Sequence, residues 1–174
     1  MDRSELIQLL LELDQHLSSR YDVILIGGAA MILHFGAARA TRDIDILITR
    51  GEAAALRAAV KAVAETHNLP EYWMNDAAKG FADILPTDFY HRLTPLGLQS
   101  RNLQLYVLGR PEQVAMKIVA LREQDLEDLE ILLPEMTEND RQVLVKIMYH
   151  VANFRLDWAQ KIRYFLMEQG WEIE

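Results

Sequence analysis

The sequence predicts an α/β fold, in which a small mixed β-sheet is flanked by helices and followed by a helical C-terminal part. Short β-branched segments alternate with helical patterns over the first 110 residues, and from residue 111 onward apolar residues recur at helical spacing. The chain of 174 residues is long enough for one hydrophobic core with an appendage. We therefore expect an α/β core over residues 1–110 and a helical part, packed on this core, over residues 111–174.

The first 67 residues alternate between helical and strand patterns. Leucines spaced four, three and four residues apart predict an amphipathic first helix. An apolar run before Gly27 predicts a buried strand, and period-two alternation after Thr41 predicts another. The predicted elements are a helix over residues 3–19, a strand over 21–26, a helix over 29–35, a strand over 42–49 and a helix over 51–67.

Local signals weaken between residues 68 and 101, where three prolines and two glycines occur. We expect loops there, with a short helix near residues 76–81 and a strand near residues 89–93. Alternation over residues 102–108 predicts a third strand. Pro111 then stands where the first position of a helix is expected, and helical periodicity continues to residue 174, with breaks near Pro134 and Asn153.

Composition excludes several classes of protein and site. Because the chain has no cysteine, it has no disulfide scaffold, no cysteine-ligated zinc or iron–sulfur site and no thiol nucleophile. Glu12 and Asp14 interrupt the first apolar stretch, which argues against a secretory segment or a membrane-spanning helix. We expect a cytoplasmic protein without a membrane partner.

The charge is acidic and unevenly distributed. The net charge is −8, and residues 112–140 hold nine acidic residues against two basic ones. This distribution argues against general electrostatic capture of DNA, but it leaves room for a local basic groove that binds RNA.

A glycine pair follows the first predicted strand. Backbone N–H groups at a helix N-terminus hold phosphates best where side chains are small, and Gly27-Gly28-Ala29-Ala30 opens a predicted helix. The later glycines of a dinucleotide-binding fingerprint and the Gly-Lys-Ser/Thr end of a P-loop are missing. A tight strand-to-helix turn without a ligand is the alternative interpretation.

Two aspartates lie on the second predicted strand. The period of two places Asp43 and Asp45 on one face, where their carboxylates can hold one Mg²⁺ together with substrate phosphates and water. A solvated strand face is the alternative for an isolated Asp-Ile-Asp sequence. The combination with the glycine turn and with Arg39 and Arg42 favours metal-assisted transfer from a nucleoside triphosphate.

These motifs together resemble those of the minimal nucleotidyltransferase fold of the DNA polymerase β superfamily. More narrowly, the chain is similar to the small bacterial nucleotidyltransferases related to the abortive-infection toxin of type IV toxin–antitoxin systems. The similarity covers roughly residues 22 to 132. It rests on residues 26–30, on Arg39-Ala40-Thr41-Arg42-Asp43-Ile44-Asp45-Ile46, on Trp73-Met74-Asn75-Asp76, on Ala115-Met116-Lys117 and on residues 120–128.

The resemblance implies a role for each matching residue. Asp43 and Asp45 would bind Mg²⁺ or Mn²⁺, and Lys117 would contact a phosphate as a point charge. One of Asp125 and Asp128 would complete the metal site or take a proton from the acceptor hydroxyl. The nucleotide-binding residues would be Gly27, Gly28, Arg39, Thr41 and Arg42.

Each of these roles has a structural alternative that involves no ligand. Lys117 could simply extend from its helix toward solvent, and Asp125 and Asp128 could belong to a solvated acidic face. Arg39 and Arg42 could pair with acidic side chains instead of a nucleotide.

One feature departs from the superfamily pattern. Its members place a third metal-binding acid on a later strand, but the strand predicted over residues 102–108 has no acidic residue. Either another acid substitutes, or metal binding is weak and activity is lost. The candidates for substitution are Asp76, Asp83, Asp88 and the Asp125/Asp128 pair.

The sequence therefore leads to two functional hypotheses. In the first, the protein uses Mg²⁺ to move a nucleoside monophosphate from a triphosphate to a hydroxyl, on a tRNA or other RNA end or on a protein, within a toxin–antitoxin or phage-defence system. A cognate antitoxin protein would then be a partner. In the second, it is a catalytically degenerate nucleotidyltransferase scaffold that serves as an antitoxin or partner-binding module.

Overall fold

The computed structural model describes residues 1–171, apart from the side chain of Ala78. The chain divides into two compact units. The first consists of residues 1–80 and 93–108, and the second consists of residues 81–92 and the chain from residue 109 onward. Residues 81–92 thus group with the C-terminal helices, whereas the sequence placed them in the core.

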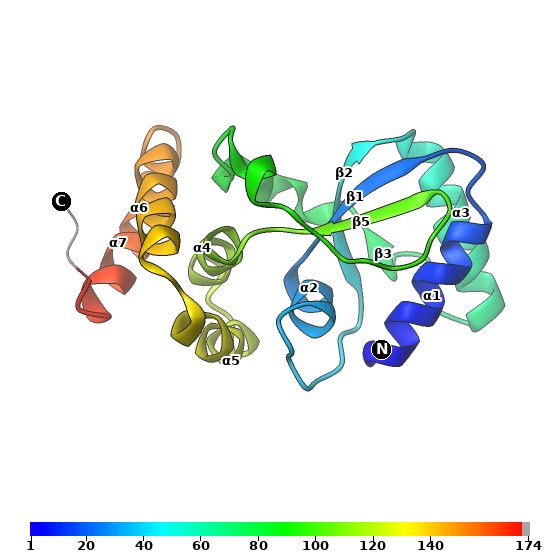
Figure 1. The fold of residues 1–174 in the computed structure, drawn as a ribbon, viewed down its shortest axis with the longest axis horizontal. Helices are drawn as coiled ribbons and strands as arrows, with labels where there is room; N and C mark the ends of the chain where they lie inside the picture. The colour runs from blue at the N-terminus through cyan, green and yellow to red at the C-terminus, as the bar shows by residue number, and fades with distance from the viewer. Residues whose placement is uncertain (172–174) are drawn as a thin grey trace. The chain divides into compact units, whose positions relative to one another are not determined.

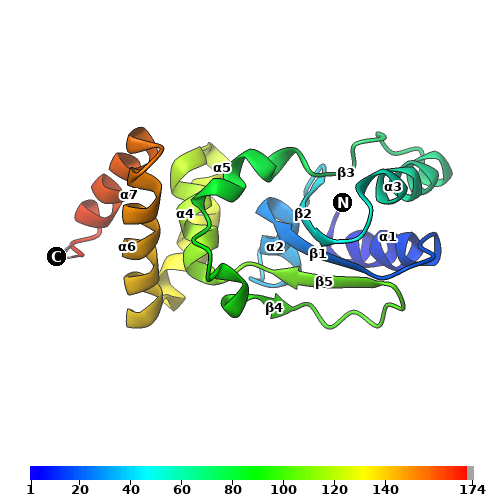
Figure 2. The ribbon, with the colours of Figure 1, turned by 90° about the horizontal axis from the view of Figure 1, so that it is seen from above.

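A five-stranded mixed sheet forms the centre of the first unit, in the order β3-β2-β1-β5-β4 (Figures 1 and 2). β1 is antiparallel to β2 and parallel to β5, while β3 runs parallel to β2 and β4 antiparallel to β5. The predicted mixed α/β architecture is confirmed. The strands are β1 (Tyr21–Ile26), β2 (Ile44–Arg50), β3 (Met74–Asn75), β4 (Thr94–Pro95) and β5 (Leu103–Val107).

Three helices accompany this sheet, namely α1 (Arg3–Gln15), α2 (Gly27–Leu33) and α3 (Ala53–His67). α1 begins in a capping box, in which Asp2 and Glu5 each accept from the other's backbone N–H. α1 packs against α3 and α2, and both views show α1 and α3 side by side (Figures 1 and 2). α1 ends at Gln15, four residues before its predicted end.

β1 is buried on both faces, and residues 23–26 form the centre of the core. The buried carboxylate of Asp14, near the end of α1, accepts hydrogen bonds from three successive backbone N–H groups just before and at the start of β5. This connection fixes the position at which β5 enters the sheet beside β1.

The second unit is helical. Its α-helices are α4 (Arg110–Ala120), α5 (Glu123–Leu132), α6 (Glu138–Ala152) and α7 (Leu156–Glu168), and its 3-10 segments include η2 (Phe89–Arg92) and η3 (Leu133–Glu135). The breaks predicted near Pro134 and Asn153 are confirmed. A further break, which the sequence did not predict, falls at Leu121, whose φ of 45° lies in the left-handed region. The predicted helical end at residues 172–174 lies outside the described residues.

Two strand predictions need correction. The strand predicted over residues 42–49 begins at Ile44, so Asp43 precedes it. The strand predicted near residues 89–93 is wrong, because Phe89–Arg92 forms a 3-10 turn and pairing begins only at Thr94. The strand over residues 102–108 is confirmed, but it is the fifth strand and not the third. The helix expected near residues 76–81 is the 3-10 segment η1 (Ala77–Ile84).

Candidate active site

The glycine turn links β1 to α2 at the end of the sheet where Asp45 lies. Gly27 adopts a φ of 62°, a conformation that side-chain-bearing residues rarely take. A Cβ atom on Gly27 would lie 3.1 Å from Oδ2 of Asp45. The positive φ therefore favours glycine, and a Cβ here would also crowd the Asp45 carboxylate.

Gly28 is enclosed by the loop between α2 and β2. A Cβ atom on Gly28 would lie 2.8 Å from Oγ1 of Thr41 and 3.3 Å from Nη1 of Arg39. A methyl group at this position would force the Thr41 side chain to move. The structure thus brings Gly27, Gly28, Arg39, Thr41 and Asp45 together.

Hydrogen bonds to Asp43 and to Met1 hold the loop that carries Arg39, Thr41 and Arg42. Thr41 Oγ1 donates to the carbonyl oxygen of Asp43 at 3.1 Å. The backbone of Thr41 also exchanges two hydrogen bonds with the backbone of Met1, at 2.5 and 2.9 Å. Because these contacts fix the loop, Thr41 is positioned beside the glycine turn, while the Arg42 side chain is exposed.

Asp45 lies on β2 between two neighbouring strands. It is paired with Ile26 on β1 and with Asn75 on β3. Asp43 immediately precedes the strand, and both aspartates are half-buried. The carboxylate of Asp45 therefore lies beside the glycine turn instead of pointing away from it, because the β1–β2 register places it next to the last residue before Gly27.

Asn75 is a residue of this region to which sequence reasoning gave no role of its own. The strand beside Asp45 that follows α3 is β3, and its Asn75 pairs with Asp45. Asn75 Oδ1 accepts from the backbone N–H of Ala77 at 3.0 Å, and Nδ2 donates to the carbonyl oxygen of Tyr72 at 3.2 Å. A strand of two residues is too short to produce an alternation pattern, so only the Trp73–Asp76 tract in the resemblance pointed here.

The second unit contains the other predicted residues as one buried ion cluster. Lys117 Nζ lies 2.8 Å from Oδ1 of Asp125 and 2.6 Å from Oδ2 of Asp128. All three side chains are at most 5% exposed. The interpretations of Lys117 as an outward-extending lysine and of the two aspartates as a solvated face therefore do not hold.

Arg122 completes this cluster from the solvent side. Its backbone N–H and its Nε both donate to Oδ2 of Asp125 at 2.9 Å. Burial opposes ionisation of Asp125, but the hydrogen bonds from Arg122 and Lys117 outweigh it and hold the pKa of this carboxyl below its usual value. The cluster thus pairs two cations with two carboxylates and joins α4 to α5.

A third buried carboxylate of this unit was not predicted from the sequence. Glu112 on α4 is fully buried and accepts from Nε of Arg92 at 2.6 Å. Burial raises the pKa of Glu112 above its ordinary value, although the Arg92 hydrogen bond works in the opposite direction. Arg92 also binds Asp88, at 3.0 and 3.1 Å, so Asp88 is engaged in this contact.

Comparison with known proteins identifies the family. Residues 4–173 match the family described as nucleotidyltransferase of unknown function (DUF6036). The chain belongs to this family. No curated protein and no solved structure matches the sequence. Family membership confirms the resemblance to nucleotidyltransferases in general. It implies a nucleoside triphosphate as substrate.

The donor set of this nucleotidyltransferase fits a metal ion that arrives with its substrate. Among residues 1–171, no group of three or more histidine or carboxylate side chains could hold a metal by itself. Asp43 and Asp45 provide two carboxylates, and Mg²⁺ is commonly bound by one or two carboxylates together with substrate phosphates and water. A resident metal ion held by protein ligands alone does not fit these residues.

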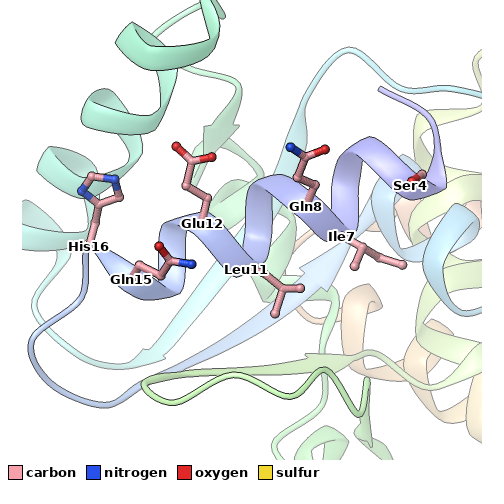
Figure 3. A pocket seen from close by; sticks show the side chains of 7 residues that line it. All are labelled: Ser4, Ile7, Gln8, Leu11, Glu12, Gln15 and His16. Atoms are coloured by element: carbon pink, nitrogen blue, oxygen red, sulfur yellow. The ribbon is translucent and has the colours of Figure 1, made fainter.

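A hollow of about 570 Å³ on α1 is not part of this site. Figure 3 shows that its seven lining side chains all come from α1 and the residue that caps it, among them Gln8, Glu12 and His16. Glu12 is engaged with Nε2 of His67 at 2.6 Å. A single helix does not provide the converging walls of a ligand pocket.

No helix in the described part of this nucleotidyltransferase is long and apolar enough to cross a membrane.

Proposed function

We propose that this chain is a Mg²⁺-dependent enzyme that transfers a nucleoside monophosphate from a triphosphate to a hydroxyl acceptor. Family membership supports nucleotidyl transfer in general. The observation that carries the proposal is the glycine turn, where Gly27 has a positive φ and a Cβ on either glycine would crowd the side chain of Asp45 or Thr41. Such a close approach of backbone and carboxylate is what a metal-bound triphosphate requires.

We assign each residue a role that its position supports. The backbone N–H groups of Gly27 and Gly28 would bind the β- and γ-phosphates, and Arg39 and Arg42 would supply positive charge beside them. Asp43 and Asp45 would hold Mg²⁺ or Mn²⁺, which neutralises the triphosphate and stabilises the pyrophosphate leaving group.

The transfer balances without a further reactant. The acceptor oxygen bonds to the α-phosphorus, and the bond from this phosphorus to the oxygen bridging to the β-phosphate breaks. Pyrophosphate leaves, and the proton of the acceptor hydroxyl passes to solvent. The chain's own contribution is to bind and orient the triphosphate for this displacement.

For Lys117, Asp125 and Asp128, direct contact with phosphate, metal or proton stays a prediction. Each of these roles would require the ion pairs of the buried cluster to open first, because Lys117 is held by both carboxylates.

The transfer can be tested with purified protein, labelled triphosphates, Mg²⁺ and total tRNA. Wild type should label an acceptor, whereas Asp43→Asn and Asp45→Asn should fall to the level of a reaction without enzyme. Asp22→Asn is the matched control, because Asp22 is a half-buried carboxylate of the same sheet that pairs with Arg20. Equal labelling by wild type and Asp45→Asn would contradict the proposal, and the labelled fraction, RNA or protein, identifies the acceptor.

A degenerate binding module is the second candidate, and a specific observation favours it. The residue paired with Asp45 on β3 is Asn75, so that position holds an amide instead of a carboxylate. If the chain binds a non-hydrolysable triphosphate with Mg²⁺ but transfers nothing, the site serves binding only. If it binds neither, it is a scaffold.

We also propose a biological role for the transfer. The resemblance to abortive-infection nucleotidyltransferases supports a toxin that modifies RNA and is restrained by a cognate antitoxin protein. Induced expression in a bacterial host should then arrest growth, and the Asp43→Asn/Asp45→Asn variant should not. Growth arrest of equal strength by both proteins would contradict a toxic transferase activity.

A further inference from the structure

A groove of about 350 Å³ lies in the first unit between α3 and residues 71–76. Its volume falls within the usual range for small-molecule sites. It is lined by Arg57, Ala58, Val60 and Lys61 of α3 and by Glu71, Tyr72, Met74, Asn75 and Asp76.

The two walls of this groove are fastened to each other. Lys61 Nζ lies 3.0 Å from Oε1 of Glu71, and Arg57 Nη1 lies 3.9 Å from Oδ2 of Asp76. These ion pairs lie one helical turn apart on α3 and at opposite ends of residues 71–76. Between them, the buried Trp73 donates its Nε1–H to the carbonyl oxygen of Val60 at 2.9 Å. Because exposed ion pairs contribute little to stability, the buried Trp73 hydrogen bond is the firmest connection between the two walls.

Tyr72 stands out on this rigid segment. Its side chain is 69% exposed, and its hydroxyl has no hydrogen-bond partner among the residues that the structure describes. Its carbonyl oxygen accepts from Nδ2 of Asn75, so the backbone beneath the ring is fixed. The ring is exposed and lies on a backbone held by this contact, so it offers an aromatic face on which a planar ring can stack.

The charge of the groove defines what the ring would stack against. Its two cations are already paired with two carboxylates, and Val60 and Met74 are buried apolar residues. The groove therefore offers no net positive charge to bind a group of phosphates. A planar, uncharged ring with polar edges fits both the apolar lining and Tyr72.

The groove adjoins the strand that carries the candidate metal ligand. Asn75 lines the groove and is also the backbone partner of Asp45 in the β2–β3 pairing. We propose that this groove binds one nucleobase, with Tyr72 as its stacking platform. The base belongs either to the triphosphate or to the acceptor RNA end. This assignment rests on the proposed function, because nucleotidyl transfer is what brings both nucleotides to Asp45.

The test measures equilibrium binding of two probes in the presence of Mg²⁺, with non-hydrolysable triphosphates so that no transfer occurs. The probes are a fluorescent single-stranded RNA of about eight nucleotides, a length within the ~4–16 nucleotides that single-strand-binding OB folds cover, and non-hydrolysable analogues of the four ribonucleoside triphosphates. Tyr72→Ala should weaken binding of one probe by roughly 5- to 100-fold, because that is the usual effect of removing one stacked base contact. Tyr72→Trp should retain binding.

Tyr90→Ala is the matched control, because Tyr90 is 57% exposed and lies in the other unit. A loss confined to triphosphates assigns the base of the donor, and a loss confined to RNA assigns the acceptor. Unchanged binding of both probes by Tyr72→Ala, or no binding of either probe by wild type, would overturn the nucleobase site.

Transfer assays separate this result from the proposed function. Transfer that depends on Asp45 but not on Tyr72 means that the function holds and the groove assignment fails. Tyr72-dependent binding without any transfer by wild type means that the nucleobase site holds and the enzymatic proposal fails.

Discussion

Gly27 and Gly28 show how far single residues could be predicted. A double glycine between an apolar strand and a helix is a local pattern, so the sequence predicted a tight strand-to-helix turn, with phosphate binding or a turn without a ligand as the two interpretations. The contacts of the turn are not local, because Asp45 and Thr41 reach it from the next strand and the loop before it. These contacts show that a Cβ at either position would crowd a neighbouring side chain, which the spacing alone could not show.

The buried state of Lys117, Asp125 and Asp128 was not predictable from their spacing. A run of acidic residues ordinarily forms a solvated helix face, and Glu123 and Glu127 do so here. Asp125 and Asp128 differ from them because α5 turns these two positions toward Lys117 on α4. Only the packing of the two helices distinguishes the buried from the exposed acids.

Replacing Lys117 tests the buried cluster. Lys117→Met should lower the free energy of unfolding by about 3–5 kcal/mol, because two buried carboxylates lose their shared counter-charge. Lys146→Met is the control, since Lys146 is exposed on α6 and should change this free energy by no more than about 0.5 kcal/mol. Denaturant unfolding at neutral pH measures both, and equal stability of the two variants would show that Lys117 is not buried against Asp125 and Asp128.

Because the pKa of Asp125 is lowered in the folded chain, the free energy of unfolding should depend on pH with a defined sign. The unfolded chain binds a proton at Asp125 at a higher pH than the folded chain does, so acid favours unfolding. The stabilisation is present above the unfolded pKa of about 3.9 and is lost as the pH falls through the lower folded pKa.

Asp125→Asn should therefore flatten the dependence of unfolding free energy on pH in this acidic range. Urea unfolding at a series of pH values measures the slope, with Asp83→Asn as the control at an exposed aspartate of η1. A slope as steep as that of wild type would mean that Asp125 is not held ionised in the fold.

At the scale of elements, long periodic segments were predicted and short ones were not. α1 and α3 repeat their apolar spacing over several turns, and their existence followed from the sequence. β3 and β4 have two residues each and exist only because a neighbouring strand pairs with them. The break at Leu121 was not predictable from the sequence. A leucine in the left-handed region is disfavoured by roughly 1–2 kcal/mol, so the sequence pattern predicts a continued helix.

Asp14 provides an element-scale prediction, because it attaches α1 to the start of β5. Asp14→Asn should destabilise the protein by about 2–4 kcal/mol, since an amide nitrogen would face backbone N–H groups that now donate to a carboxylate. Glu65→Gln on the exposed face of α3 should have little effect on the unfolding free energy. If thermal unfolding shows the same midpoint for both variants, Asp14 does not hold β5 in place.

At the scale of the whole molecule, the negative charge is concentrated in the second unit. The first unit holds eleven acidic and nine basic residues, whereas the second holds fifteen acidic and nine basic residues. The glycine turn and its arginines belong to the nearly balanced first unit. A polyanionic substrate would therefore meet less repulsion there than the net charge of −8 suggests.

The central claim is that the glycine turn beside Asp45 binds a metal–triphosphate. Gly27→Ala introduces a methyl group 3.1 Å from Asp45 Oδ2, whereas Gly36→Ala places one where no described atom lies within 4 Å, at a similarly positive φ. Both variants therefore carry the same kind of backbone strain, and only Gly27→Ala crowds the site.

Calorimetric titration with a non-hydrolysable triphosphate and Mg²⁺ measures this difference directly. Wild type and Gly36→Ala should bind the two ligands together, and Gly27→Ala should bind at least about tenfold more weakly, a change of about 1.4 kcal/mol. Equal affinity of Gly27→Ala and Gly36→Ala for the metal–triphosphate would contradict a binding site at this turn.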